Sequence, residues 1–201
     1  MTAYPSPLAK ALSVAHNRGM MRFALALFLA LAFAPIACAD QSDWRLNRMF
    51  ERLSQTTLEG EAAQLESSIW QLWMRSENED SNILMRLGVN AMNTGDYPAA
   101  LRAFDRMVKD DPNFAEGWNK RATVHYLMDN YDASVADIER TLALEPRHFG
   151  ALSGLGMINV EINNHKGALS ALEAALKVHP YLRGARHSIE ELKKKLLGSP
   201  T

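Results

Sequence analysis

Residues 149–182 have the sequence FGALSGLGMINVEINNHKGALSALEAALKVHPYL, and two earlier segments, 81–114 and 115–148, follow the same pattern. Prolines near the segment ends, Pro112, Pro146 and Pro180, are spaced 34 residues apart. A shift of 34 residues also aligns Leu84, Trp118 and Leu152; Leu87, Arg121 and Leu155; Gly88, Ala122 and Gly156; Ala100, Ser134 and Ala168; and Phe104, Ile138 and Leu172. A fixed period of this length indicates a chain built from stacked repeats.

Each 34-residue period predicts two amphipathic helices. Apolar residues recur at steps of three and four, as in Leu84, Leu87 and Ala91, which places them on one helical face. Small residues at 88, 122 and 156 oppose small residues at 100, 134 and 168, so the two helices can approach closely. Gly and Asn between the helices accept a left-handed turn. One pair cannot bury its apolar face alone, so we expect an all-α solenoid of stacked pairs.

This arrangement resembles the tetratricopeptide repeat family, whose 34-residue unit has a large residue, then Leu-Gly, a small residue, a further large residue and a closing proline. The resemblance implies a right-handed solenoid of antiparallel helix pairs with repeats at 81–114, 115–148 and 149–182. It also implies that the first helix of each repeat lines a concave groove that binds a peptide or helix of a partner protein. The residues at those positions are Asn82, Met85, Val89, Met92, Asn119, Thr123, Tyr126, Ser153, Met157 and Val160.

The chemistry of these positions restricts the expected ligand. The stripe is apolar and adaptable, with Asn and hydroxyl groups that can bond a peptide backbone. Family members that hold a C-terminal carboxylate use Lys, Asn and Arg, whereas this chain has Met85, Val89, Gly150 and Gly154 there. A carboxylate clamp is therefore not expected.

Helical patterns also flank the three repeats. Residues 44–53 and 58–73 predict a helix pair within 40–80, and Phe50 and Trp73 fall one period before Leu84 and Met107, as in a degenerate first repeat. Residues 182–197 predict a last helix in which acidic residues at 190 and 191 precede lysines at 193–195, an order that suits the helix dipole. Segment 183–201 is thus expected to be a polar capping helix and tail.

The first 39 residues have the features of a secretory signal peptide. Three basic residues precede an apolar run at 23–34, and small residues stand at Ala37 and Ala39, so cleavage is expected before Asp40. The run is shorter than the roughly 20 residues of a membrane span, so the mature protein is not expected to be an integral membrane protein. Because Met20 could open a compact signal, residues 1–19 are either a start-site extension or a long basic region.

Cys38 is the only cysteine and bears on the compartment. A cysteine after an apolar run is lipidated in bacterial lipoproteins, but Pro35 stands where leucine is usual. Plain cleavage, which discards Cys38, is the favoured interpretation. The mature chain would then contain no cysteine. Such a chain fits the bacterial periplasm, the expected location, because that compartment is oxidising and favours disulfides.

Composition and spacing argue against other classes of function. The chain has 22 basic and 23 acidic residues and a formal charge of −1, so nucleic acid is not an expected partner. No two histidines have the spacing of metal ligands on one helix, and one cysteine cannot build a metal centre. Neither a glycine-rich phosphate loop nor a serine nucleophile motif is complete. We therefore expect no enzymatic activity, no cofactor and no metal.

The sequence predicts a protein-binding scaffold or adaptor of the cell envelope. The alternative is a structural protein that self-associates through its Trp-rich first helices, with Trp44 and Trp70, or through its cap. A third hypothesis is an enzyme or lipid carrier whose site has no recognised motif.

Overall fold

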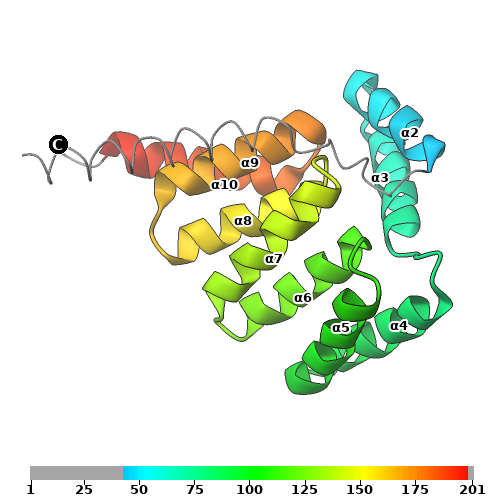
Figure 1. The fold of residues 1–201 in the computed structure, drawn as a ribbon. Coiled ribbons are helices and arrows are strands. Elements are labelled where there is room, and N and C mark those ends of the chain that lie inside the picture. Colours follow the sequence, from blue (N-terminus) through cyan, green and yellow to red (C-terminus); the bar gives the residue numbers. More distant parts are fainter. Residues whose placement is uncertain (1–42, 199–201) are drawn as a thin grey trace, which may run out of the picture. The chain divides into compact units, whose positions relative to one another are not determined.

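The computed structural model describes residues 43–198, and every regular element in this range is an α-helix (Figure 1). The predicted signal peptide, Cys38 and residues 199–201 lie outside the described residues. Within 43–198, no helix is both long and apolar enough to cross a membrane. The predicted all-α class is confirmed.

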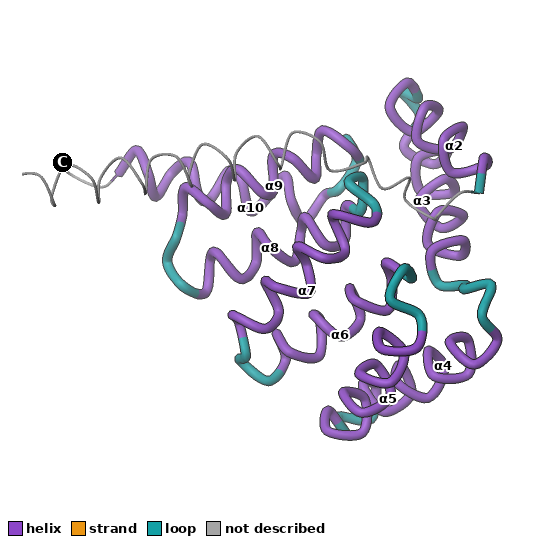
Figure 2. Tube along the Cα trace, viewed as in Figure 1, coloured by secondary structure: helices purple, strands orange, loops and turns teal. Residues whose placement is uncertain are grey.

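Nine helices lie within residues 43–198, joined by short connections (Figure 2). They are α2 (Trp44–Gln55), α3 (Glu59–Trp73), α4 (Glu79–Asn93), α5 (Tyr97–Asp110), α6 (Ala115–Leu127), α7 (Tyr131–Leu144), α8 (Phe149–Glu161), α9 (His165–Val178) and α10 (Arg183–Gly198). Each predicted repeat segment contains one closely packed pair: α4 with α5, α6 with α7 and α8 with α9. The α10 helix packs on α9 as the predicted cap, and buries Ala185, Ile189 and Leu192 there.

Close contact inside the pairs depends on small residues. A Cβ atom at Gly88 would lie 2.5 Å from the ring of Phe104, and one at Gly156 would lie 2.6 Å from Leu172. In the middle pair, the Ser134 hydroxyl donates a hydrogen bond of 2.8 Å to the carbonyl oxygen of Ala122. The periodic small residues therefore set the distance between the helices of each repeat.

The turns inside the pairs use residues that accept a left-handed backbone. Gly95, Asp129 and Asn163 have φ angles of 79°, 58° and 58°. The second helix of a pair then begins with a side-chain cap in two repeats: Asp96 accepts from the amide of Ala99, and Asn164 accepts from the amide of Gly167. These turns reverse the chain so that consecutive helices lie antiparallel.

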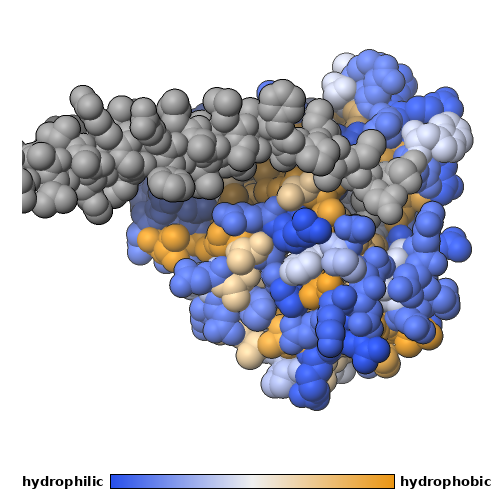
Figure 3. Space-filling view, viewed as in Figure 1, coloured by the Kyte–Doolittle hydropathy of each residue, from blue (hydrophilic) through white to orange (hydrophobic). Residues whose placement is uncertain are grey.

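Most of the visible surface is polar, with apolar residues in separate patches (Figure 3). One such patch covers the lower right of the view, where Figure 1 places α4. On α4, the apolar side chains of Ile83 and Leu87 are well exposed.

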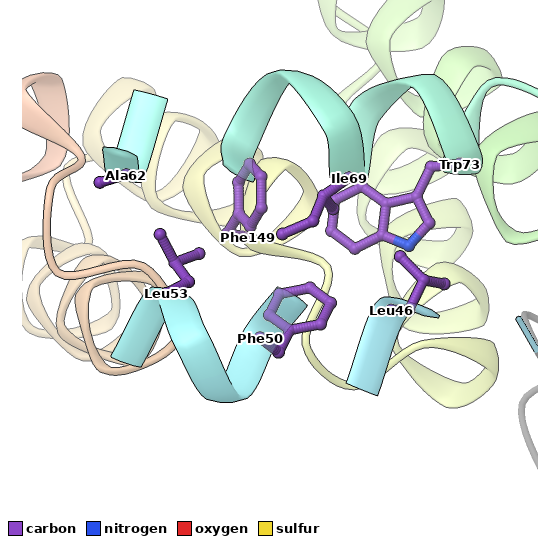
Figure 4. Packing of buried hydrophobic residues seen from close by; sticks show 7 residues of the cluster. All are labelled: Leu46, Phe50, Leu53, Ala62, Ile69, Trp73 and Phe149. Carbon is purple, nitrogen blue, oxygen red and sulfur yellow. The ribbon is translucent and has the colours of Figure 1, made fainter. Parts of the chain in front are cut away.

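The structure corrects the prediction that α2 and α3 stack on the next pair as a first repeat. The two helices, called the hairpin below, pack on each other, but neither is among the helices in extensive contact with α4. The hairpin packs instead against Phe149, Val178, Tyr181 and Leu182, at the connections between later repeats. Figure 4 shows Phe149 among the buried side chains of α2 and α3.

The local sequence explains why the hairpin does not behave as a repeat. The α2 helix ends at Gln55, one residue after Ser54, which occupies the register position of Gly88. Ser54 is exposed whereas Gly88 is buried, so the hairpin lacks the mid-helix close approach. Its buried Trp73 is 5.0 Å from Phe149, measured between ring centroids. Aromatic burial against the inter-repeat connections therefore determines where the hairpin packs.

Candidate protein-binding groove

The predicted groove residues lie on α4, α6 and α8, but the structure does not bring them into one pocket. Asn82, Met85 and Val89 line an open pocket of about 550 Å³, called the repeat-one pocket below. Ser153 and Met157 line a second open pocket of about 740 Å³, called the hairpin pocket. The other five are absent from the linings of both pockets: Met92, Asn119, Thr123, Tyr126 and Val160.

The repeat-one pocket lies beside the connection between α3 and α4. Its apolar lining comes from Met74, Met85 and Val89, of which Met85 is buried. The Asn82 side chain accepts from the Ser76 amide and donates to the Ser76 carbonyl, both at 2.9 Å. Asn82 therefore holds the α3–α4 connection, and its amide is already occupied.

The polar groups predicted on α6 are also bonded within the protein. Asn119 is buried and donates to Oε2 of Glu116 at 2.9 Å, and the Thr123 hydroxyl donates to the Asn119 carbonyl at 2.9 Å. The Tyr126 hydroxyl lies 3.5 Å from Oε1 of Glu161. Partial burial raises the pKa of Tyr126, and the nearby Glu161 carboxylate raises it further. These bonds stabilise α6 and its neighbours. One N–H of the Asn119 amide is used by Glu116, and the role of Asn119 in binding a ligand backbone stays a prediction.

The hairpin pocket is formed where α3 faces α8, α9 and the start of α10. Met157 lies on α8 with 49% of its surface exposed, and Ala63, Gly184 and Ala185 add small residues from the surrounding helices. The Ser153 hydroxyl donates to the Phe149 carbonyl at 2.8 Å. This pocket therefore combines a flexible apolar side chain with walls that a protein segment can approach closely.

Met92 and Val160 are half-buried and pack against the hydrophobic core. Met92 packs against the cluster of α4 and α5, and Val160 packs against the cluster of α9 and α10. Both residues are on the predicted helices but contribute little free surface.

The wall that α3 gives to the hairpin pocket was not predicted. Glu66 contacts Nε2 of His179 at 3.1 Å, the Tyr181 hydroxyl donates to the Thr56 carbonyl at 2.9 Å, and Arg183 pairs with Glu59 at 2.6 Å. These contacts join residues 113, 125 and 124 positions apart. No sequence signal of fixed spacing identifies such distant partners; the cluster of Trp residues at 70 and 73 was the only indication of an unusual apolar face.

Comparisons with known proteins agree with the repeat geometry. The tetratricopeptide repeat family model matches residues 85–127 and 120–183. A TPR repeat-containing protein of Rhizobium etli is 36% identical over 157 residues, which cover 78% of this chain and 77% of that protein. The chain belongs to the tetratricopeptide repeat family.

Solved tetratricopeptide domains share the fold. The first domain of Spaghetti (RPAP3), bound to an HSP90 peptide, has a TM-score of 0.58 and 17% identity, covering 61% of this chain and 97% of that chain. The second domain of human RPAP3, in complex with an HSP70 peptide, has a TM-score of 0.55 and 18% identity, covering 58% and 97%. Tetratricopeptide domains are typically protein-interaction modules without catalytic activity.

In this tetratricopeptide protein, a buried polar cluster joins α6, α8 and the hairpin. Nε2 of His148 lies 2.8 Å from Oε2 of Glu116, and both side chains are fully buried. Because Nδ1 of His148 accepts from the Ala151 amide at 3.1 Å, Nε2 carries the proton in the neutral ring and donates it to Glu116. The His148 ring also stacks on Trp73, with centroids 4.1 Å apart and planes 9° from parallel.

The charge of Glu116 is stabilised by this cluster. Burial by itself raises the pKa of Glu116, but the hydrogen bond from His148 and the nearby Lys120 ammonium outweigh it and leave the pKa below its ordinary value. The carboxylate lines neither pocket. Among residues 43–198, no group of three or more His, Cys, Asp or Glu side chains could hold a metal ion. The cluster therefore acts in packing and holds the hairpin against α8.

Proposed function

We propose that this protein is a non-enzymatic scaffold of the cell envelope that binds a partner protein at the hairpin pocket. The observation that carries the proposal is the pocket itself, where half-exposed Met157 lies opposite α3. A flexible thioether adapts to varied apolar side chains. The small residues beside it allow a helix or extended segment to come close.

Two further observations support the proposal. The similar RPAP3 domains hold peptides, so the fold suits this kind of ligand. The signal pattern at 23–39 supports an envelope location. Intact-mass measurement on protein recovered from a periplasmic fraction should give a chain that begins at Asp40. Retention of residues 23–39 would contradict the location.

The binding site is tested by comparing two equally exposed apolar residues on α8 and at its end. Met157 lines the hairpin pocket, whereas Ile162, 53% exposed, does not. Envelope proteins that the wild-type chain captures are first identified. The affinity of each captured protein is then measured for the wild-type chain, for Met157→Asp and for Ile162→Asp. Met157→Asp should lower the affinity for the physiological partner at least about thirtyfold, as the loss of an interface hot spot does. Ile162→Asp should bind like wild type. Equal affinity for all three chains would overturn the site.

The alternative of self-association through the Trp-rich helices has less support. Trp73 is fully buried, and Trp70 packs so close to Gly150 that a Cβ there would lie 2.6 Å from its ring. Trp44, at 64% exposure, is the hairpin tryptophan with a large free surface. Trp70 and Trp73 thus pack on the protein's own repeats, and Trp44 alone of the three offers a free aromatic surface.

A further inference from the structure

The first repeat has an apolar face that no other described helix covers fully. It consists of Ile83, Leu84, Leu87 and Ala91 of α4 and is called the α4 face below. Leu87 is 58% exposed and Ile83 is 41% exposed, while Leu84 and Ala91 are half-buried.

In the later repeats, the position equivalent to Leu87 contacts the preceding helix pair. The residues one and two periods after Leu87 are Arg121 and Leu155, and both are half-buried in contacts between helix pairs. Arg121 donates to Asp105 of the preceding α5 at 2.9 Å, and Leu155 packs in a cluster with Ile138 of the preceding α7. The position of Leu87 is therefore a stacking position, but the hairpin that precedes it packs elsewhere.

We infer that a second copy of this chain covers the α4 face, in a two-fold symmetric dimer. The face continues the stacking interface of the repeats, so it fits a helix of the same kind. The opposite end of the solenoid does not offer one, because between residues 183 and 196 the exposed side chains of α10 are polar, among them Arg186, Glu190 and Lys193. Pairing of one α4 with another gives a closed assembly, whereas end-to-end stacking would give an open filament.

The charges of α4 suit antiparallel pairing with itself. When Ile83 of one copy lies opposite Leu87 of the other, the same register places Asp80 opposite Asn90, whose amide can donate to the carboxylate. It places Glu79 opposite Ala91. Arg86 lies on another side of α4, where it lines the repeat-one pocket, so it stays outside this contact and no two like charges of α4 face each other. Antiparallel helices also align their dipoles favourably. The α4 face is thus complementary to its own two-fold image.

Sedimentation equilibrium over a series of concentrations tests this dimer with matched variants. The purified chain should show a reversible monomer–dimer equilibrium. Leu87→Glu should raise the dissociation constant at least about thirtyfold, because it places a charge in the centre of the interface. Ile162→Glu, an equally exposed change away from the α4 face, should leave the constant unchanged. Circular dichroism confirms that each variant keeps its helices.

A second measurement does not depend on any variant. Hydrogen exchange of the wild-type chain should slow with concentration in α4 and not in α10. A wild-type chain that stays monomeric at all concentrations would overturn the dimer and leave the face to a different partner. A dimer that survives Leu87→Glu, with no change of exchange in α4, would place the interface elsewhere.

Discussion

Gly88 is a residue at which one methyl group should disturb a whole repeat. A Cβ there would lie 2.5 Å from the buried ring of Phe104, whereas a Cβ at Gly60 meets nothing within 4 Å. Gly88→Ala should therefore lower the free energy of unfolding by about 1–3 kcal/mol through overpacking. Gly60→Ala should raise it by up to about 1 kcal/mol, because Ala is the better helix former. Urea denaturation of both variants makes the comparison, and equal effects would contradict the close approach.

Arg121 pairs with the buried Asp137 of its own repeat and with the exposed Asp105 of the preceding repeat. It donates to both oxygens of Asp137, at 2.8 and 2.6 Å, and to Asp105 at 2.9 Å, while Asp137 is only 3% exposed. Arg121→Ala should cost about 3 kcal/mol, because it leaves a buried carboxylate unpaired. Arg106→Ala, which breaks an exposed pair with Asp110, should cost less than about 1 kcal/mol. Thermal melts that rank the two variants in the opposite order would refute the stabilising role of the buried Arg121–Asp137 pair.

Single residues differ in how far sequence reveals them. The role of Gly88 follows from the 34-residue register, because packing inside a repeat is local. Asn119 and Asn82 were predicted to face a ligand, yet both amides bond to the protein. Register assigns a residue to a face of its helix, but a partner three or six residues away can occupy its polar group. For Asn119 the partner is the Glu116 carboxylate, and for Asn82 it is the Ser76 backbone.

At the scale of elements, the α4–α9 pairs could be predicted because each repeats one local pattern. The hairpin helices were predicted as helices, but their packing was predicted wrongly. Their partners His179, Tyr181 and Arg183 lie more than 110 residues away. Without periodic spacing, nothing in the sequence connects those residues to Glu66 or Thr56.

The hairpin should be separable from the solenoid by removing its buried anchor. Trp73 is fully buried and stacks on His148. Trp73→Ala should cost about 3–5 kcal/mol locally, so α2 and α3 should lose protection from hydrogen exchange while α5 and α7 keep theirs. Trp44→Ala, at an exposed position on the same hairpin, serves as the control. Uniform loss of protection across all helices would show that the hairpin is part of a single cooperative unit.

Docking of the hairpin should also depend on pH through Glu116. Because the pKa of Glu116 in the fold lies below its ordinary value of 4.5, the charged carboxylate stabilises the fold at neutral pH. That contribution should decrease as the pH falls below about 4.5 toward the lowered value. Glu116→Gln should flatten the acid decline of the unfolding free energy, and Glu77→Gln, at an exposed position, should not. Identical acid slopes for wild type and Glu116→Gln would contradict this role.

At the scale of the whole molecule, the repeats and the hairpin have different tasks. The third repeat provides α8 and α9 for the hairpin pocket, the capping helix provides α10, and the hairpin adds a fourth wall through α3. The same displacement of the hairpin leaves the α4 face open at the start of the solenoid. Both proposed interactions therefore depend on where α2 and α3 pack.

That placement can be measured directly by nuclear Overhauser spectroscopy of the isotopically labelled chain. The structure predicts cross-peaks from the Trp73 indole protons to the rings of His148 and Phe149, whose centroids lie 4.1 and 5.0 Å away. Cross-peaks from Trp73 to Leu84 and Leu87 of α4, with none to His148 or Phe149, would show that the hairpin stacks as an ordinary first repeat and would contradict the account.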